Sequence, residues 1–259
     1  MRDLNAIATI AYRDVLKFLR DPSRIIGAII FPLVFVGVLG GSFQANLGKT
    51  AGFNFLTFIF TGVLLQTMFQ SSSLGIVSLL EDRDNDFSQE IFISPISRYA
   101  IIFGKIVGES VVALFQGIAV IAFGLVAGVP LTVASLVALT PALIIACLLG
   151  GAFGVICLSL FSSQRAANQL FPMVFLPQFF LAGVFNPIHK LPLPLDILSH
   201  LAPMRYAVDL GRAVFYAGKP EYPLVVSDTP FLNLAVIAAM FAVFLVAGTT
   251  LFVRNERNK

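Results

Sequence analysis

The chain alternates between long apolar runs and short polar connections. Helices satisfy their own backbone hydrogen bonds where water is absent, so such runs suit a lipid bilayer. A bilayer core about 30 Å thick requires roughly 20 apolar residues in a helix, and every run except the fifth reaches or approaches that length. The pattern therefore predicts an all-α membrane protein with six transmembrane helices. The runs cover residues 25–43, 53–80, 101–129, 133–161, 170–185 and 231–253.

The first 24 residues follow a different pattern, in which apolar side chains recur at helical spacing and charged side chains lie opposite them. Asp21-Pro22 ends this helix, because the residue before a proline disfavours the helical backbone region. We interpret residues 1–24 as an amphipathic interfacial helix on the cytoplasmic side, without a cleaved signal peptide. A solvated helix that packs on a partner is the alternative, and the two interpretations are compatible. Residues 25–259 then form the six-helix transmembrane domain.

Composition and charge agree with a membrane protein. Hydrophobic residues make up 58% of the chain, and only 12% of its residues are charged, against roughly 25% in a typical soluble domain. The net charge of +3 is too small to indicate a nucleic-acid partner. Of the 17 Lys and Arg residues, 12 fall at the two termini and after the second and fourth runs, and 5 fall on the other side. This bias predicts that both termini are cytoplasmic.

The connection after the second run, residues 81–98, combines acidic residues with an apolar cluster. A loop that is merely solvated has no need of such a cluster, whereas an amphipathic helix that docks on a partner or on the membrane surface does. Docking is the favoured interpretation, and a plain interfacial loop is the alternative. The candidate docking residues are Asp82, Arg83, Asp86, Phe87, Glu90, Ile91, Phe92 and Pro95.

The connection before the sixth run, residues 186–230, is rich in both proline and apolar residues. Irregular backbone at membrane depth is tolerated only where protein buries it or water fills a cavity. We therefore expect re-entrant outer helices between spans five and six. Within this region, residues 204–216 resemble a short amphipathic helix that carries Arg205, Asp209 and Arg212.

Few polar residues occur within the apolar runs. Gln66, Gln70 and Ser73 have the spacing of one helical face, and in the fifth run Phe179 and Phe180 follow Gln178. We interpret these six residues as lining a substrate path, with hydrogen bonding between helices as the alternative role of the glutamines. Glu109 is a functional candidate because intramembrane ionisable residues are costly. Alternatively, it pairs with Lys105, whose side chain reaches the cytoplasmic face.

Glycines four residues apart recur in the apolar runs, as in Gly104/Gly108 and Gly150/Gly154. Small residues at this spacing allow two helices to approach closely.

The sequence lacks an energy source of its own. Gly48-Lys49-Thr50 resembles the end of a phosphate-binding loop, but the nearest upstream glycine, Gly41, leaves six intervening residues where the motif requires four. No metal-ligand spacing or catalytic motif is present, so we expect no enzymatic activity and no metal. This combination favours a membrane subunit driven by a separate ATPase. The alternatives are an ion-coupled secondary transporter, which typically shows an ionisable relay and an internal repeat, and a non-transporting membrane scaffold.

Three stretches resemble the ABC-2 type permeases, the membrane subunits of ATP-binding-cassette exporters. They are the amphipathic N-terminus, residues 83–105 with Gly104-Lys105 at their end, and residues 180–187 followed by 201–206. One departure is Phe87-Ser88-Gln89-Glu90, where the family often has Gly-Thr before the glutamate.

The resemblance implies a transmembrane dimer of permease copies in a prokaryotic inner membrane. It further implies two ATP-binding cassette subunits that bind ATP and Mg, so that the chain itself holds no cofactor. Residues 81–98 would be the coupling helix that receives the motion of those subunits. The implied activity is the outward export of a hydrophobic or amphipathic substrate, such as a drug, lipid or glycoconjugate.

Overall fold

The computed structural model describes residues 2–79, 97–161, 164–189 and 191–257. Every regular element within these ranges is a helix, which confirms the predicted all-α class for the described residues. The helices are α1 (Arg2–Leu19), α2 (Pro22–Val34), the π-helix η1 (Phe35–Gly40), α3 (Gly41–Leu47), α4 (Phe55–Gly75), α7 (Arg98–Val126), α8 (Val133–Leu160), α9 (Gln164–Leu181), α10 (Leu193–Leu201), α11 (Pro203–Phe215), α12 (Tyr222–Val225) and α13 (Pro230–Arg257).

Five stretches of the described residues are long and apolar enough to cross a membrane. The first of them, Ile25–Leu47, runs without a break through α2, η1 and α3. The fifth predicted run corresponds to α9, which has 18 residues and a length of about 27 Å. Polar residues such as Gln164 and Arg165 occupy its first turn and lower its hydropathy, so α9 is not among the five. The other four are Phe55–Gly75, Tyr99–Val126, Val133–Leu160 and Tyr222–Arg254.

Helices α4 and α8 form the centre of the fold. Nearly all of α4 is buried, and it contacts α8 along much of its length. This contact requires the predicted glycine pair on α8. A β-carbon at Gly150 would collide with the carbonyl oxygen of Phe69, and one at Gly154 would lie 2.5 Å from the carbonyl oxygen of Ser73. The close approach predicted for this pair is therefore confirmed. Helices α7, α11 and α13 pack around the central pair.

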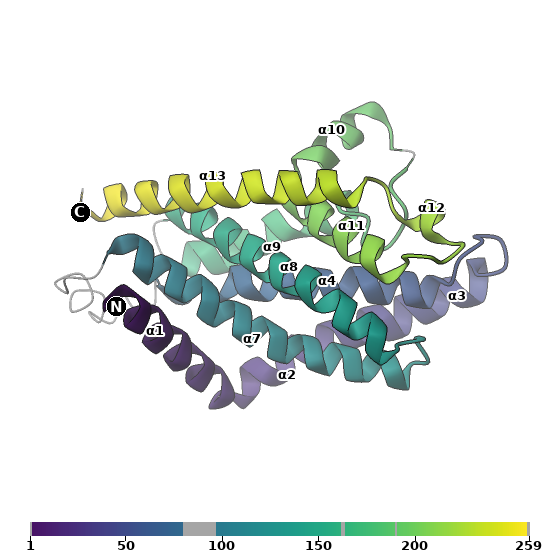
Figure 1. The fold of residues 1–259 in the computed structure, drawn as a ribbon, viewed down its shortest axis with the longest axis horizontal. Helices are drawn as coiled ribbons and strands as arrows, with labels where there is room; N and C mark the ends of the chain where they lie inside the picture. Colours follow the sequence, from purple (N-terminus) through teal and green to yellow (C-terminus); the bar gives the residue numbers. More distant parts are fainter. Residues whose placement is uncertain (1, 80–96, 162–163, 190, 258–259) are drawn as a thin grey trace.

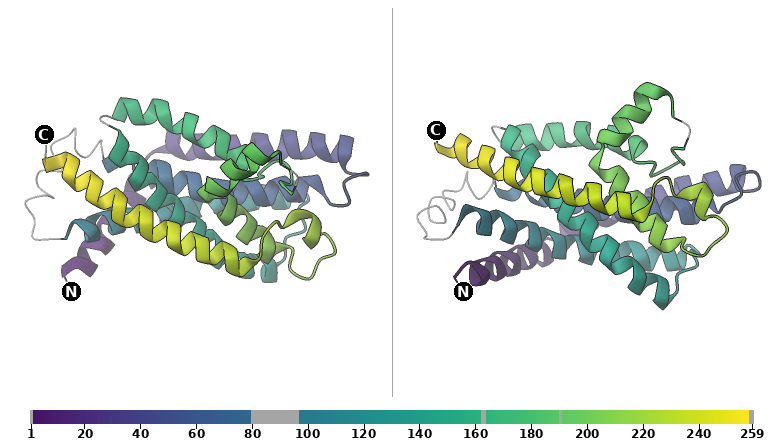
Figure 2. Two further views of the ribbon diagram at one scale, coloured as in Figure 1. Left: turned by 90° about the horizontal axis from the view of Figure 1, so that it is seen from above. Right: turned by 45° about the horizontal axis from the view of Figure 1, so that its top comes forward.

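Helix α1 lies against the first half of α7, and the two helices stay side by side in all views (Figures 1 and 2). Glycines of α7 again permit the contact. A β-carbon at Gly104 would lie 3.0 Å from the α-carbon of Ile7, and one at Gly108 would lie 2.9 Å from the α-carbon of Ala11. The predicted N-terminal helix is thus a packed element of the fold.

The start of α1 and the end of α13 lie at one end of the molecule (Figure 1). The connections from α3 to α4 and from α7 to α8 lie at the opposite end, together with α12. We refer to these as the terminal end and the outer end. Helix α10 projects from the side of the bundle toward the outer end.

Candidate substrate pocket and buried charges

A pocket of about 360 Å³ lies between α2, α4 and α7. Glutamine, threonine and serine side chains provide its polar groups, and phenylalanine, proline and leucine provide its apolar wall. Among the described residues of the pocket lining, no side chain carries a charge. The lining residues are Gly27, Phe31 and Pro32 of α2, Thr67, Gln70, Ser71 and Leu74 of α4, and Gln116 of α7.

The predicted path residues of α4 divide between two environments. Gln70 lines the pocket, and the side-chain amide of Gln66 donates a hydrogen bond to the Gln70 Oε1 atom at 3.1 Å. Ser73 is fully buried on the side of α4 that faces α8, where its backbone lies against Gly154. The pocket face of α4 is therefore Thr67, Gln70, Ser71 and Leu74, which have the i, i+3, i+4, i+7 spacing of one helical stripe.

The predicted path residues of α9 also divide. Phe179 is buried, and its ring centroid lies 6.1 Å from that of Phe31. It therefore packs on a residue of the pocket wall and is not itself among the lining residues. Phe180 is 57% exposed and packs on Phe185 instead. Gln178 is buried. Adjacent residues of a helix differ by about 100° in direction, so Phe179 and Phe180 face different surroundings.

The pocket has the physical character of a site for uncharged amphipathic molecules. Its volume falls within the roughly 300–1,000 Å³ of small-molecule sites, which are mostly apolar with a few polar groups that fix orientation. Gln116 is buried and Gln70 is half-buried, so their amides are partly shielded from solvent. A second pocket of about 500 Å³ is lined by α8 alone, by Val137, Thr140, Pro141, Ile144 and Ile145. It lacks converging polar groups from a second helix.

At the outer end, three charged residues of α11 point into the protein. Arg205, Asp209 and Arg212 are all buried, although they belong to the helix predicted to be amphipathic. Their i, i+4, i+7 spacing does place them on one face, as that prediction requires. The predicted helix is therefore confirmed, but its polar face contacts protein groups, and we call these three residues the α11 spine.

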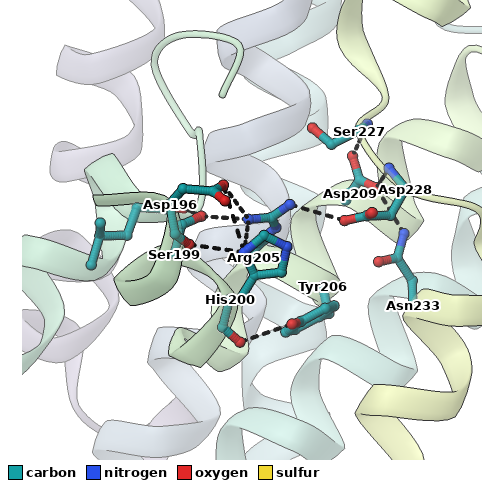
Figure 3. Close-up of polar contacts among 10 residues, drawn as sticks. Asp196, Ser199, His200, Arg205, Tyr206, Asp209, Ser227, Asp228 and Asn233 are labelled. Atoms are coloured by element: carbon teal, nitrogen blue, oxygen red, sulfur yellow. Dashed lines mark hydrogen bonds and ion pairs between the residues drawn. The ribbon is translucent and has the colours of Figure 1, made fainter. Parts of the chain in front are cut away.

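Arg205 joins α10 to the segment that precedes α13 (Figure 3). Its guanidinium donates to the Ser199 hydroxyl at 2.9 Å and, on the other side, to the Asp228 carboxylate at 3.1 Å. The Ser199 hydroxyl in turn donates to the carbonyl oxygen of Leu181, the last residue of α9. The Tyr206 hydroxyl donates to the carbonyl oxygen of His200 and adds a second bond between α10 and α11.

Asp209 secures the start of α13. Its carboxylate accepts hydrogen bonds from the backbone amides of Ser227 and Asp228 and from the side-chain amide of Asn233, each at 2.8 Å (Figure 3). These three donors lie in the connection before α13 and in its first turns. A buried carboxylate with three donors is well compensated for the loss of water.

Arg212 holds the turn that follows α9. Gly183 has a φ of 68°, a left-handed conformation that glycine adopts readily, and it ends α9. Arg212 donates to the buried carbonyl oxygens of Gly183 at 2.8 Å and Val184 at 3.1 Å. It also donates to the carbonyl oxygen of Phe58 and lies 3.6 Å from the centroid of that ring. Arg212 thereby links irregular backbone to the central helix α4.

Nearer the terminal end, Lys105 of α7 is buried between two carboxylates. Its ammonium lies 2.8 Å from Asp14 of α1 and 3.0 Å from Glu109 of α7. The predicted pair with Glu109 is therefore present, whereas the lysine is enclosed by protein instead of reaching toward a surface. Asp14 lies on the same helical stripe as Ile7 and Ala11, the residues of α1 that pack on Gly104 and Gly108. The prediction that the charged residues of α1 lie opposite its packed apolar face is therefore wrong for Asp14.

The predicted coupling residues Asp82, Arg83, Asp86, Phe87, Glu90, Ile91, Phe92 and Pro95 lie outside the described residues. In the part of the chain that the structure describes, no group of three or more His, Cys, Asp or Glu side chains is placed to hold a metal ion.

In the described residues, these features define a helical membrane protein with an amphipathic pocket and buried charged contacts between helices. Residues 5–216 match the family model of the ABC-2 type transporter, which is most of the chain. The chain belongs to the ABC-2 type transporter family.

Curated relatives agree with this assignment. The chain is 23% identical over 246 residues to a putative transport permease, ycf38, of Cyanophora paradoxa, covering 93% of this chain and 85% of the relative. It is 25% identical over 223 residues to the inner membrane transport permease YadH of Escherichia coli K12, covering 85% and 86%. It is 27% identical over 139 residues to the probable multidrug ABC transporter permease YbhR of the same organism, covering 54% and 38%. Together with the apolar helices, these matches indicate a multi-pass membrane transport permease.

Proposed function

We propose that this chain is the permease subunit of an ATP-driven exporter that moves a hydrophobic or amphipathic substrate outward. Such substrates include drugs, lipids and glycoconjugates. The observation that carries the proposal is the pocket between α2, α4 and α7, in which uncharged amide and hydroxyl groups face an aromatic and aliphatic wall. An amphipathic molecule would bind there mainly by burial of apolar surface, with the polar groups fixing its orientation.

The proposed assembly contains two permease copies and two ATP-binding cassette subunits, which supply ATP and Mg binding. Both termini are cytoplasmic, α9 is the fifth of six spans, and residues 186–230 form re-entrant outer helices. Residues 1–24 are the interfacial helix and 25–259 the transmembrane domain. An even number of crossings is supported by the position of α1 and the end of α13 at one end of the molecule (Figure 1). The 12-to-5 distribution of basic residues supports the cytoplasmic side.

Reconstitution tests the ATP-driven activity. The permease is placed in lipid vesicles with its cognate ATPase, and loss or gain of a fluorescent amphiphile is followed after ATP addition. We expect transport that requires ATP and stops when the ATPase carries an inactive phosphate-binding loop. Transport driven by a proton gradient without ATP would establish a secondary transporter instead. A scaffold would neither transport nor stimulate ATP hydrolysis.

The pocket is tested by replacing Gln70 with Leu. If Gln70 lines the path, the change should alter which substrates stimulate ATP hydrolysis and shift half-saturation by roughly fivefold, the equivalent of one hydrogen bond of about 1 kcal/mol. If the glutamine only joins helices, thermal stability should fall with substrate preference unchanged, and Gln70 would leave the site. Gln169→Leu is the matched control, because Gln169 is exposed on α9 and is not part of the pocket lining.

The docking role of residues 81–98 is tested by replacing Phe87 and Ile91 with Asp. Loss of the apolar cluster should abolish ATPase binding and transport while membrane insertion is retained. Co-purification of the ATPase measures the result, and binding at wild-type affinity would refute the docking role.

Orientation is tested with an impermeant thiol reagent. Cysteines introduced at Ser88 and Lys219 should label from opposite sides of the membrane, Ser88 from the cytoplasm and Lys219 from outside. Equal labelling of both from outside would contradict the proposed topology.

A further inference from the structure

Three ionisable side chains meet where α1 crosses the first turns of α7. Lys105 lies within 3.0 Å of carboxylate oxygens of both Asp14 and Glu109, and each of the three side chains is only 1% exposed. Arg13, with 25% of its side chain exposed, donates to the second oxygen of Asp14 at 3.3 Å. The Lys105–Glu109 pair lies within α7, whereas the Lys105–Asp14 pair joins α7 to α1.

Glycines of two helices lie close to these side chains. A β-carbon at Gly108 would lie 3.1 Å from Asp14 Oδ2, and one at Gly75 of α4 would collide with the carboxylate of Glu109. Three helices therefore converge on the cluster. A second bond joins α1 to the start of α7, because the backbone amide of Ser97 donates to the Asp3 carboxylate at 3.4 Å. Ser97 is also the N-cap of α7.

Burial of this cluster is not explained by stability alone. Buried ion pairs contribute little net stability, because desolvation offsets most of their attraction. Two helices in contact through glycines also have few side chains that fix their relative register. An ion pair does fix register, since displacement by one turn would separate the ammonium from its carboxylate and leave both charges buried and unpaired.

We propose, on the basis of the proposed function, that Asp14, Lys105 and Glu109 form a clamp that makes α1 and the first turns of α7 a single lever. Helix α7 begins at Arg98, the last residue of the predicted coupling segment, so a force applied to that segment passes directly into α7. The clamp passes the same displacement to α1. Asp14 and Lys105 act as positioning residues, because they connect the two helices and are not part of the pocket lining.

Two single substitutions separate the clamp from mere charge burial. Asp14→Asn leaves the neutral Lys105–Glu109 pair within α7 and removes the ionic link to α1. Glu109→Gln leaves the neutral Lys105–Asp14 pair and retains that link. Each variant loses one carboxylate charge and keeps nearly the same shape, so the two are matched in these respects. Asp14→Asn also weakens the bond that Asp14 accepts from Arg13 of the same helix. Substrate molecules moved per ATP hydrolysed are measured for each in vesicles that contain the ATPase.

We expect Asp14→Asn to lower transport per ATP by roughly fivefold, the lower part of the range for coupling between distant sites. Glu109→Gln should lower it by less than about twofold, because its interhelix link remains. Equal losses in the two variants, or no loss in either, would overturn the clamp. ATPase co-purification is measured in parallel, and it should be unchanged in both.

A covalent tether tests the lever in a protein that keeps its charges. Cysteines at Ile10 and Gly104 lie within reach of a disulfide, since a β-carbon at Gly104 would be 3.5 Å from the β-carbon of Ile10. That β-carbon would also lie 3.0 Å from the α-carbon of Ile7, so the reduced double variant is first compared with the wild type. The native Cys147 and Cys157 are buried on α8. Helices that move together should transport equally well with the tether oxidised or reduced. Inhibition on oxidation, reversed by a reductant, would show that α1 and α7 slide past one another and would overturn the proposal.

The two proposals fail differently. If the wild-type permease and its ATPase show no ATP-driven transport, the proposed function fails. If the wild type transports but the matched variants behave alike, the function holds and the clamp is rejected.

Discussion

Buried charge is used differently at the two ends of the molecule. Two residues of the α11 spine bond mostly to backbone groups: Arg212 donates to three carbonyl oxygens, and Asp209 accepts from two backbone amides. The third, Arg205, bonds to side chains. The Lys105 clamp bonds to side-chain carboxylates. Irregular chain at the outer end leaves peptide groups without partners, whereas the regular helices α1 and α7 satisfy their own peptide groups.

This difference indicates what each set of charges contributes. Peptide groups buried without partners are costly, so the α11 spine makes the irregular outer connections stable. The ion pairs of the clamp join side chains, so the clamp mainly determines how two complete helices are aligned. Substitutions in the spine should therefore affect stability first, and substitutions near the clamp should affect alignment first. Three predictions test this comparison, from the largest expected effect to the smallest.

Replacing Arg212 with Met should cause the largest loss. The turn carbonyls of Gly183 and Val184 would lose their buried donor, and the stacking on Phe58 would lose its cation. Each buried acceptor left without a partner costs about 1–3 kcal/mol, and both turn carbonyls lose theirs, so we expect a markedly lower unfolding temperature and reduced yield.

The unfolding temperature is measured on purified protein in detergent. Lys219→Met is the control, because the Lys219 ammonium also lies over an aromatic ring, 3.8 Å from the Phe215 centroid, but makes no hydrogen bond with the residues that the structure describes. If both variants unfold at the same temperature, Arg212 does not hold the turn.

Replacing Asp209 with Asn should cause an intermediate loss. The carboxylate accepts hydrogen bonds from three donors. In asparagine one of its two oxygens is replaced by an NH₂ group, which would face at least one of these N–H donors and could not accept from it. A buried donor left unsatisfied costs about 1–3 kcal/mol. The free energy of unfolding in denaturant measures the effect. Asp228→Asn is the comparison, since Arg205 would keep an acceptor oxygen there and its bond to Ser199. A larger loss in Asp228→Asn would show that Asp228, and not Asp209, provides the main support for the start of α13.

Replacing Gly75 with Ala should have the smallest effect on stability and a visible effect on alignment. The new methyl group would occupy the position of the Glu109 carboxylate, which can move because it ends a flexible side chain. Overpacking of this kind costs typically about 1–3 kcal/mol, and the low end applies where a side chain can yield.

Accessibility of a cysteine at Leu4, an exposed position of α1, reports the alignment by its rate of thiol labelling. Gly41→Ala is the control, because no atom lies within 4 Å of a β-carbon at that position. Unchanged labelling in Gly75→Ala would show that the clamp tolerates displacement of Glu109.

Hydrophobic patterning was sufficient to predict most helices of the fold. The apolar runs at 133–161 and 231–253 match α8 and α13 closely, because uncharged stretches of that length have few stable alternatives in a bilayer. Helix α11 was also predicted, but the inward direction of Arg205, Asp209 and Arg212 was not. Periodicity places residues on a common face, and it does not say whether that face meets water or protein.

The candidate site was predicted less completely. The spacing of polar residues correctly predicted that Gln70 lines the pocket. It indicated Gln66 and Ser73 where the structure has Thr67 and Ser71, because the two sets have a similar helical spacing. The two sets form overlapping stripes on α4, and the sequence does not show which stripe faces the pocket and which faces α8. The contact of Lys105 with Asp14 depends on how α1 packs on α7 and lies beyond any local pattern.

The choice of partner for Arg212 has a consequence for how such permeases can diverge. A carbonyl oxygen is present whatever the residue, so Phe58 and Val184 can be exchanged for other residues without loss of the hydrogen bond itself. Lys105 depends instead on side chains, the carboxyl groups of Asp14 and Glu109. In related proteins the residues that bond to Arg212 through their carbonyl groups can therefore vary with few constraints from these bonds. A change at Lys105 requires compensating changes on both α1 and α7.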